Sequence, residues 1–330
     1  MAAYKEDIRR EPLLKRRWDF KSRRSSDLPG GILITGPGSF IGSHIVKLLQ
    51  DLAYGPVFLL LRAGSEKEAV RKMQYAFDNW KLGNFKQEAF IILSGDVSQK
   101  YMGLTTTRYK QVKYQTGKVL HLAMTPMYHL PYRHFQRVWV PELERMIAFC
   151  GSGNAPKSLH YASSFNAMFF TEENDFLSVN TNAWQSGYAG FKWVAREAIN
   201  NAFSQNLNGC IYDIPLVLGT ANRGRSPRHY SIWMILDIFL KTGRYFDFTF
   251  RIIPVDALAE IMVFNLISEK ANESSRFIRP VLNEPVTDKL LSLTAANILG
   301  LKRDNPENIR ELYPNKLRFD FLMPDNFYAL

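Results

Sequence analysis

Short, unbroken apolar runs alternate with helically spaced apolar residues along the first two thirds of the chain. After Gly42, for example, Ile45, Leu48, Leu49 and Leu52 recur at helical spacing, and residues 65–80 form a second helical stretch. Unbroken runs of four to eight apolar residues are typical of strands buried on both faces. The strands expected on this basis are 31–35, 56–61, 90–93, 118–123 and 158–164. Strands alternating with helices predict an α/β fold with a doubly wound parallel sheet, the Rossmann architecture.

The pattern changes after about residue 215. Residues 220–229 are rich in Gly, Arg, Pro and Asn and indicate a loop, while residues 231–241 have helical spacing. We expect a basic, flexible leader over 1–28, a Rossmann NADP-binding domain over 29–220, and a smaller C-terminal substrate-binding domain over 221–330. Within the last of these, 252–268 is a helix that could return to the Rossmann domain. Ligands of such folds bind at the carboxyl edge of the sheet.

Composition limits the class of protein. The chain has 330 residues, 46% of them hydrophobic and 22% charged, as in an ordinary globular protein. No run reaches the roughly 18 apolar residues of a membrane helix, and two cysteines cannot form a disulfide framework. We therefore expect a cytoplasmic protein with no membrane partner.

The net charge of +11 is concentrated in part in the first 28 residues, at 15–17 and 21–24. One interpretation is a solvated leader, and the other is a surface that attracts an acidic partner. No nucleic-acid-binding motif accompanies these clusters, so no nucleic-acid partner is expected. The histidines have no metal-ligand spacing, so no metal is expected, and His121 and His160 are interpreted as bonded core residues.

A strand, a glycine turn and a helix N-terminus follow one another at residues 31–49. Small residues let the backbone approach a pyrophosphate, and the free amides of the first helical turn favour an anion. This arrangement is the dinucleotide-binding fingerprint in the right structural context. The residues expected to bind the cofactor here are Thr35, Gly36, Gly38, Ser39, Phe40, Ile41 and Gly42.

The second predicted strand ends at Arg62, where an NAD-binding protein would carry an acidic residue for the ribose hydroxyl. An arginine suits a 2′-phosphate, and Lys72 could add a second positive charge. The cofactor predicted by this position is NADPH rather than NADH. The alternative for Arg62 is an exposed charge at the end of a strand.

Tyr188 and Lys192 stand four residues apart and so share one helix face. The phenol titrates near about 10, and a fixed ammonium beside it favours the phenolate and eases proton transfer. The pair indicates reduction of a carbonyl group. The alternative for Tyr188 is a half-buried aromatic residue of the helix.

Several motifs occur in an order that resembles one enzyme family: Ile-Thr-Gly36 with Gly42, Leu-Leu-Arg62-Ala, Gly95-Asp96-Val97-Ser98, His121-x-Ala123, Ser163-Ser164, Gly187-Tyr188-x-x-x-Lys192-Trp193 and Pro254-Val255-Asp256. The order resembles the extended short-chain dehydrogenase/reductases. Within them it is most similar to the terminal thioester reductase domains of nonribosomal peptide synthetases and carboxylic acid reductases, over residues 30–270.

The resemblance implies roles for further residues. Asp96 and Val97 would lie beside the adenine, Ala123 near the cofactor, and Pro215, Val217 and Leu218 near the nicotinamide, while Tyr188 and Lys192 would both contact the cofactor. The catalytic residues it implies are Ser164, which would bind the substrate carbonyl oxygen, Tyr188 as the proton donor, and Lys192. The alternative for Ser164 is a cap of the next helix.

Three positions depart from the family pattern. Ser39 replaces the middle glycine of the turn, where its side chain would crowd the pyrophosphate or bond to it. The segment 139–143 replaces Asn-Val-x-Gly-Thr, and Asp213-Ile-Pro215 replaces Arg-Pro-Gly.

The resemblance implies an NADPH-dependent reductase that releases an acyl or peptidyl chain from a carrier-protein phosphopantetheine arm as an aldehyde or alcohol. This sequence contains no carrier or adenylation domain, so we expect either an acyl or peptidyl carrier protein that acts in trans as the partner of a monomer, or one domain cut from a longer polypeptide. The alternatives are an extended short-chain reductase of a free ketone, aldehyde or acyl-CoA, a redox-independent cyclising relative, and a non-catalytic carrier-binding module. Residues 246–250 could line an acyl channel or belong to the core.

Overall fold

The structure is a computed structural model of the 330-residue chain. It describes residues 8–21, 30–124, 127, 130–165, 167, 187–222, 224–227, 230–245, 252–268, 276–280, 294 and 296–312. The aromatic segment 246–250, for which a channel or a core role was expected, lies outside the described residues.

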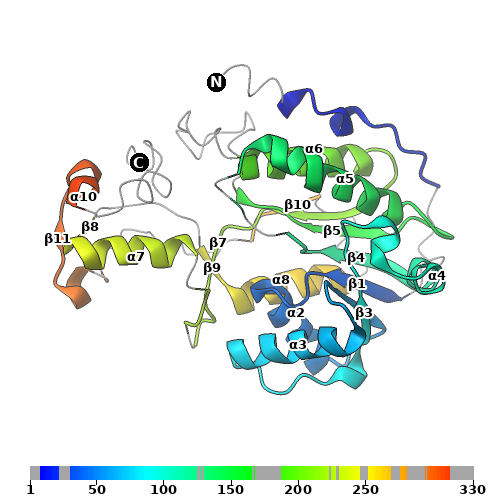
Figure 1. The fold of residues 1–330 in the computed structure, drawn as a ribbon, viewed down its shortest axis with the longest axis horizontal. Helices are drawn as coiled ribbons and strands as arrows, with labels where there is room; N and C mark the ends of the chain where they lie inside the picture. The colour runs from blue at the N-terminus through cyan, green and yellow to red at the C-terminus, as the bar shows by residue number, and fades with distance from the viewer. Residues whose placement is uncertain are drawn as a thin grey trace.

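A seven-stranded sheet of parallel strands forms the centre of the protein (Figure 1). Its order is β10-β6-β5-β4-β1-β2-β3, with successive crossovers running to either side of β1. The strands are β1 Gly31–Thr35, β2 Val57–Leu61, β3 Ile91–Ser94, β4 Thr116–His121, β5 Ser158–Ala162, β6 Asn208–Tyr212 and β10 Phe277–Ile278. The predicted doubly wound Rossmann sheet is confirmed. Because β4 and β5 end at His121 and Ala162, the predicted site residues Ala123 and Ser164 lie in the loops that follow them.

Helices cover both faces of the sheet (Figure 1). One layer holds α2 Phe40–Asp51, α3 Glu66–Trp80 and α8 Val255–Ile267, and the other holds α5 Tyr132–Cys150 and α6 Gly187–Phe203. The central strand β1 serves both layers, since Leu33 packs with α5 and α6 while Ile32 and Ile34 pack with α2 and α8. Burial on both faces explains the unbroken apolar runs. The helix α4, Thr106–Gln115, precedes β4 in the chain and lies at one end of the sheet (Figure 1).

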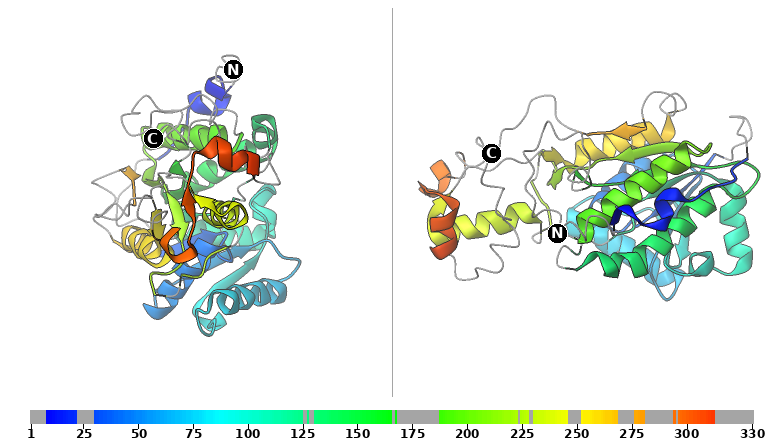
Figure 2. Two further views of the ribbon diagram at one scale, coloured as in Figure 1. Left: turned by 90° about the vertical axis from the view of Figure 1, so that its left-hand side faces the viewer. Right: turned by 90° about the horizontal axis from the view of Figure 1, so that it is seen from above.

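The segments after β6 leave the main sheet. The strands β7 Leu216–Leu218 and β9 Ile252–Pro254 form a two-stranded parallel sheet. The helix α7, Ser231–Thr242, extends away from the main sheet toward β8 Arg244–Tyr245, β11 Lys302–Arg303 and α10 Pro306–Leu312 (Figures 1 and 2). These elements share a small apolar cluster around Phe239 and Ile309. The helix α8, which follows β9, returns to the main sheet and packs against α2.

Residues 8–21 differ from the flexible leader expected over 1–28. They include a short 3-10 helix at Pro12–Lys15 and pack on the outside of α5 and α6 (Figure 2). Ile8 and Leu13 are buried, and the Glu11 carboxylate accepts hydrogen bonds of 3.0 Å each from the Tyr132 hydroxyl and the Gln136 amide. The basic cluster at 15–17 therefore lies on a segment that apolar burial and hydrogen bonds hold against α5 and α6, while residues 22–24 of the second cluster lie outside the described residues.

Candidate functional site

The glycine turn between β1 and α2 fits a close backbone approach. Gly36 has a φ of +70°, and a Cβ added there would lie 2.9 Å from the Ala123 backbone nitrogen. A Cβ added to Gly42 would lie 2.4 Å from the Gly36 carbonyl oxygen. Both positions therefore require glycine. The turn brings the N-terminus of α2 to the carboxyl edge of the sheet, where a dinucleotide pyrophosphate binds in this architecture.

The Ser39 side chain bonds to the helix that it precedes. It is the N-cap of α2, and its hydroxyl oxygen accepts a 3.1 Å hydrogen bond from the Gly42 amide. The hydroxyl thus satisfies one of the amides of the first helical turn from within the chain. Within the described part of the chain, the amides of Phe40 and Ile41 have no hydrogen-bond acceptor. They remain the donors that an anion at this helix end could use.

An open pocket of about 500 Å³ lies at the carboxyl ends of β2 and β3. Arg62, Lys72 and Asp96, all predicted cofactor residues, line it together with Glu68 and Gln99. Lys72 donates a 2.6 Å hydrogen bond to the Arg62 carbonyl oxygen and forms a 2.7 Å ion pair with Glu68. The Arg62 side chain is exposed. The pocket therefore combines an exposed guanidinium with an ammonium that is already paired.

Thr35 joins the glycine turn to the neighbouring strand. Its hydroxyl oxygen lies 2.8 Å from His121 Nδ1 and accepts a 3.3 Å hydrogen bond from the Ala123 amide. These contacts fix the loop after β4 directly against Gly36. Ala123 consequently lies beside the turn, while His121 is a bonded core residue, as is His160 through its 2.9 Å contact with the Tyr212 hydroxyl.

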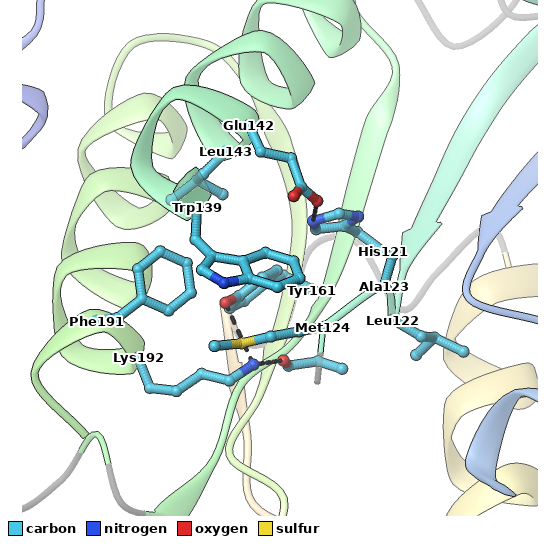
Figure 3. Close-up of a pocket in the computed structure, with 11 residues that line it drawn as sticks. His121, Leu122, Ala123, Met124, Trp139, Glu142, Leu143, Tyr161, Phe191 and Lys192 are labelled. Carbon is cyan, nitrogen blue, oxygen red and sulfur yellow. Dashed lines mark hydrogen bonds and ion pairs between the residues drawn. The ribbon is translucent and has the colours of Figure 1, made fainter. Parts of the chain in front are cut away.

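Tyr188 and Lys192 lie in the first turns of α6, and both are buried, with relative exposures of 7% and 4%. The Lys192 ammonium donates a 2.7 Å hydrogen bond to the Ala162 carbonyl at the end of β5 and a 3.3 Å bond to the Tyr161 hydroxyl (Figure 3). It lies 5.8 Å from the centre of the Tyr188 ring. The tyrosine ring packs edge-to-face on Phe135. The predicted pair Tyr188 and Lys192 therefore lies at the carboxyl edge of the sheet, beside the end of β5.

Ser164 follows β5 in a loop that is tied to the end of β6. The Ser163 amide donates to the Tyr212 carbonyl over 2.9 Å, and the Phe165 amide donates to the Ile214 carbonyl over 3.0 Å. Ser164 itself is partly buried. The chain after β6 continues through Pro215 into β7, which contains Val217 and Leu218. The fold therefore brings Ser164 and the segment 215–218 to the carboxyl edge of the sheet, where α6 begins.

Asp213, one of the departures from the family pattern, is fully buried behind this loop. Its carboxylate lies 3.5 Å from Arg196 Nε and 4.0 Å from Arg279 Nε. Burial raises the pKa of Asp213, and the two guanidinium groups oppose that rise. The acidic residue is therefore neutralised by arginines from α6 and from the segment after β10.

Three polar residues that line one pocket with Lys192 were not predicted as parts of the site: Glu142, Tyr161 and His121 in a chemical role. Glu142 is 2% exposed, and its Oε1 lies 3.8 Å from His121 Nε2. A signal for it exists in the sequence, because Glu142 falls on the buried stripe of α5 with Phe135 and Met146. A carboxylate on an apolar stripe indicates a specific partner.

Burial changes the protonation of this group. Burial lowers the pKa of Lys192 to about 7, although the Glu142 carboxylate opposes that fall. Burial also raises the pKa of Glu142 to about 8, with Asp96 contributing to the rise. Burial lowers the pKa of His121 to about 3, so this imidazole is neutral. An ammonium and a carboxyl group that both titrate near neutrality therefore lie in one site.

The described residues contain neither a metal-binding cluster nor a membrane-spanning helix. No group of three or more His, Cys, Asp or Glu side chains is arranged to hold a metal ion in this part of the chain. Among the helices that the structure describes, none combines the length and apolar character needed to cross a membrane.

Comparison with known proteins gives the family and the fold. The sequence model of the male sterility protein family, an NAD-binding domain, matches residues 34–262, well over half of the chain. The terminal R domain from the myxalamid PKS-NRPS biosynthetic pathway has the same fold, with a TM-score of 0.80 and 16% identity. That match covers 97% of this chain and 84% of the other.

Two curated relatives are longer proteins. A linear gramicidin synthase polypeptide of Brevibacillus parabrevis is 21% identical over 259 residues, which cover 75% of this chain and 5% of the synthase. Aldehyde reductase lnbA of Aspergillus flavus is 26% identical over 216 residues, which cover 60% of this chain and 21% of the reductase. The chain thus spans about a fifth or less of the length of these relatives.

Proposed function

The chain belongs to the male sterility protein family of NAD-binding domains, and from this premise we propose that it is an NADPH-dependent reductase of carrier-bound thioesters. Its product would be an aldehyde or an alcohol. The observation that carries the proposal is the buried Tyr188 and Lys192 pair, which α6 presents at the carboxyl edge of the sheet beside the glycine turn.

The proposed chemistry is a proton delivered to an oxygen that gains charge. A bound nicotinamide cofactor supplies the hydride that adds to the acyl carbon. Ser164 hydrogen-bonds the acyl oxygen, and the Tyr188 hydroxyl gives that oxygen its proton. The Lys192 ammonium, held by the Ala162 carbonyl, stabilises the tyrosinate that remains. The hemithioacetal then loses its C–S bond, giving an aldehyde and a thiol.

The residues present fit a dinucleotide at the glycine turn. Gly36 and Gly42, where a Cβ would meet backbone atoms of the chain itself, let the turn close tightly at the N-terminus of α2, whose first-turn amides would bind the pyrophosphate. The exposed Arg62 guanidinium in the 500 Å³ pocket supports NADPH, because a 2′-phosphate needs a cation there. Glu68 reduces the contribution of Lys72 by pairing with it. We therefore assign the preference for NADPH to Arg62.

The substrate and partner are proposed from similarity and charge. The myxalamid R domain, which shares the fold of this chain, comes from a PKS-NRPS biosynthetic pathway. The net charge of +11 favours the encounter with an acidic carrier protein whose phosphopantetheine arm brings the acyl thioester. We propose that the catalytic unit is a monomer.

The test uses the full chain with an acyl thioester on a purified carrier protein. Nicotinamide absorbance and the released product are followed with NADPH and, separately, with NADH. We expect oxidation of NADPH coupled to aldehyde or alcohol formation. The same acyl group on coenzyme A, and the free aldehyde, identify the alternative substrates.

The matched variants are Tyr188→Phe and Tyr161→Phe, which remove one hydroxyl each from neighbouring buried rings. Tyr188→Phe should retain cofactor binding and lose turnover by about 10² to 10⁴, the usual contribution of a positioned proton donor. Tyr161→Phe should lose less, because the Tyr161 hydroxyl bonds Lys192 rather than the substrate. Full activity in Tyr188→Phe would exclude the proposed mechanism, and absence of cofactor binding by the unmodified chain would exclude the reductase.

A further inference from the structure

A small cavity lies beside Lys192, between α5, α6 and the ends of β4 and β5 (Figure 3). Its volume of about 10 Å³ is close to the smallest space that holds one water molecule, roughly 10 to 15 Å³. Polar side chains of His121, Trp139, Glu142, Tyr161 and Lys192 line it. A cavity of this size with several polar walls suits an ordered water.

Two of the lining polar atoms are buried without a hydrogen-bond partner among the residues described. They are Glu142 Oε1, which accepts, and Trp139 Nε1, which donates. His121 Nε2 lies 3.8 Å from Glu142 Oε1, which is too long for a hydrogen bond. A buried polar atom of this kind destabilises the fold unless it has a hydrogen-bond partner. One water molecule could satisfy both.

Tyr161 completes a path from this cavity to Lys192. Its hydroxyl oxygen accepts from Lys192 Nζ over 3.3 Å, and among the described residues no acceptor is recorded for its own proton, which can therefore be donated to a water in the cavity that Glu142 also lines. The ring is fixed by stacking on His121, with centroids 5.8 Å apart. Glu142 and Lys192 are therefore linked through one hydroxyl and one water-sized space.

We propose that Glu142 is the buried proton-exchange partner of Lys192, acting through Tyr161 and a water molecule in this cavity. Glu142 is thus a positioning residue that sets the pH range over which Lys192 stays charged. The exchange breaks the O–H bond of the Glu142 carboxylic acid and forms an N–H bond on the Lys192 amine. An acid and an amine become a carboxylate and an ammonium, so the summed charge of the pair stays at zero.

Several charged groups face Glu142 from the surrounding elements. The Asp96 carboxylate after β3 raises the pKa of Glu142, while Arg62 after β2, Arg145 on α5 and Lys192 on α6 lower it. Since the His121 imidazole is kept neutral by the fall of its pKa to about 3, it adds no charge near neutrality. Lys192 is the buried cation whose own pKa the Glu142 carboxylate raises.

The first test measures the titration midpoint of Lys192 directly and does not depend on enzyme turnover. The chain is labelled with ¹³C-lysine, the Lys192 Cε signal is assigned by its loss in Lys192→Arg, and its titration is followed by NMR. In Glu142→Gln we expect the Lys192 midpoint to move about one pH unit lower, since an opposite charge nearby raises a pKa by about 1 to 3 units. The control is Glu144→Gln, two residues along the same helix, whose carboxylate pairs with Arg16 at the surface.

A second variant keeps the inference testable if Glu142→Gln does not fold. Tyr161→Phe removes the hydroxyl that links the two groups and should also lower the Lys192 midpoint. Where both variants fold, the double variant should shift no further than the larger single one, because both act through one path. An unchanged midpoint in Glu142→Gln, or additive shifts in the double variant, would overturn the proposal.

The catalytic consequence rests on the proposed reductase function. The high-pH limb of the kcat profile should move with the Lys192 midpoint, so that turnover above the new midpoint falls about tenfold for one unit. Glu142→Asp, which keeps the carboxylate, should restore most of the loss. If the Lys192 midpoint moves in Glu142→Gln but the unmodified chain oxidises no NADPH, the proposed reductase function is refuted while the influence of Glu142 on Lys192 is supported. A moved midpoint with an unmoved kcat limb would refute that role in catalysis.

Discussion

Replacing Ser39 with glycine should strengthen cofactor binding. In the structure the Ser39 hydroxyl oxygen accepts from the Gly42 amide at 3.1 Å, so this amide is occupied by the chain itself. Removing the hydroxyl returns the amide to the set of donors that face a pyrophosphate at the N-terminus of α2. The effect on affinity and the effect on stability have separate causes and can be measured separately.

The magnitude follows from the one hydrogen bond that is exchanged. A hydrogen bond to a charged group contributes about 1.5 to 3 kcal/mol, and the extra freedom of glycine costs about 0.5 kcal/mol. The net gain at the lower end is about 1 kcal/mol, which lowers the Kd for NADPH about fivefold. Stability should hardly change, because Gly replaces Ser at an N-cap at a cost of a few tenths of a kcal/mol. Ser39→Ala should instead cost about 1 kcal/mol.

The assay is titration of the protein with NADPH, followed by cofactor fluorescence, together with thermal unfolding of each variant. Thr105→Gly is the control, since Thr105 caps α4 in the same way, accepting from the Arg108 amide over 3.3 Å. It should leave the Kd unchanged. Weaker NADPH binding by Ser39→Gly would refute the reasoning and show that the hydroxyl contacts the phosphate itself.

Three further predictions concern other parts of the chain. Arg62→Ser should raise the Kd for NADPH about tenfold, because it removes a charge-assisted bond of roughly 1.5 kcal/mol, and should leave the Kd for NADH within about twofold; equal losses for both cofactors would contradict the assignment. Ile8→Ala should lower the free energy of unfolding by about 2 kcal/mol, the low end for a fully buried isoleucine, and an unchanged denaturation midpoint would mean that residues 8–21 do not stabilise the fold. Burial lowers the pKa of Lys157 from 10.5 to about 8, so the unfolded chain binds more protons between these values and stability should rise with pH across that window. Lys157→Met should remove this part of the pH dependence, and a slope that persists in urea titrations of the variant would assign it to another group.

Local pattern predicted most of the architecture. The run at 31–35 became β1 with the same bounds, and the helix expected over 65–80 begins one residue later at Glu66, with Ser65 as its cap. Such elements follow from residues close together in the chain, because burial on both faces and helical periodicity leave a local signature. The i, i+4 spacing of Tyr188 and Lys192 is predicted for the same reason.

The leader illustrates where local pattern fails. Its cationic side chains indicate a solvated segment, but Ile8, Leu13 and Phe20 are buried against α5 and α6. Three apolar residues spaced irregularly through a charged segment give no periodic signal. Only the presence of complementary apolar surface on distant helices makes their burial favourable.

The sequence by itself determined the sheet, the glycine turn, the shared helix face of Tyr188 and Lys192 and the basic end of β2, since each depends on neighbours within a few residues. The tertiary structure alone decided what surrounds Lys192. Glu142 reaches it from α5, Tyr161 from β5 and His121 from β4. These residues lie far apart in the chain, and their meeting depends on strand order and on the packing of α5 against α6. Burial in that shared, low-dielectric space then sets their protonation, which no spacing in the sequence encodes.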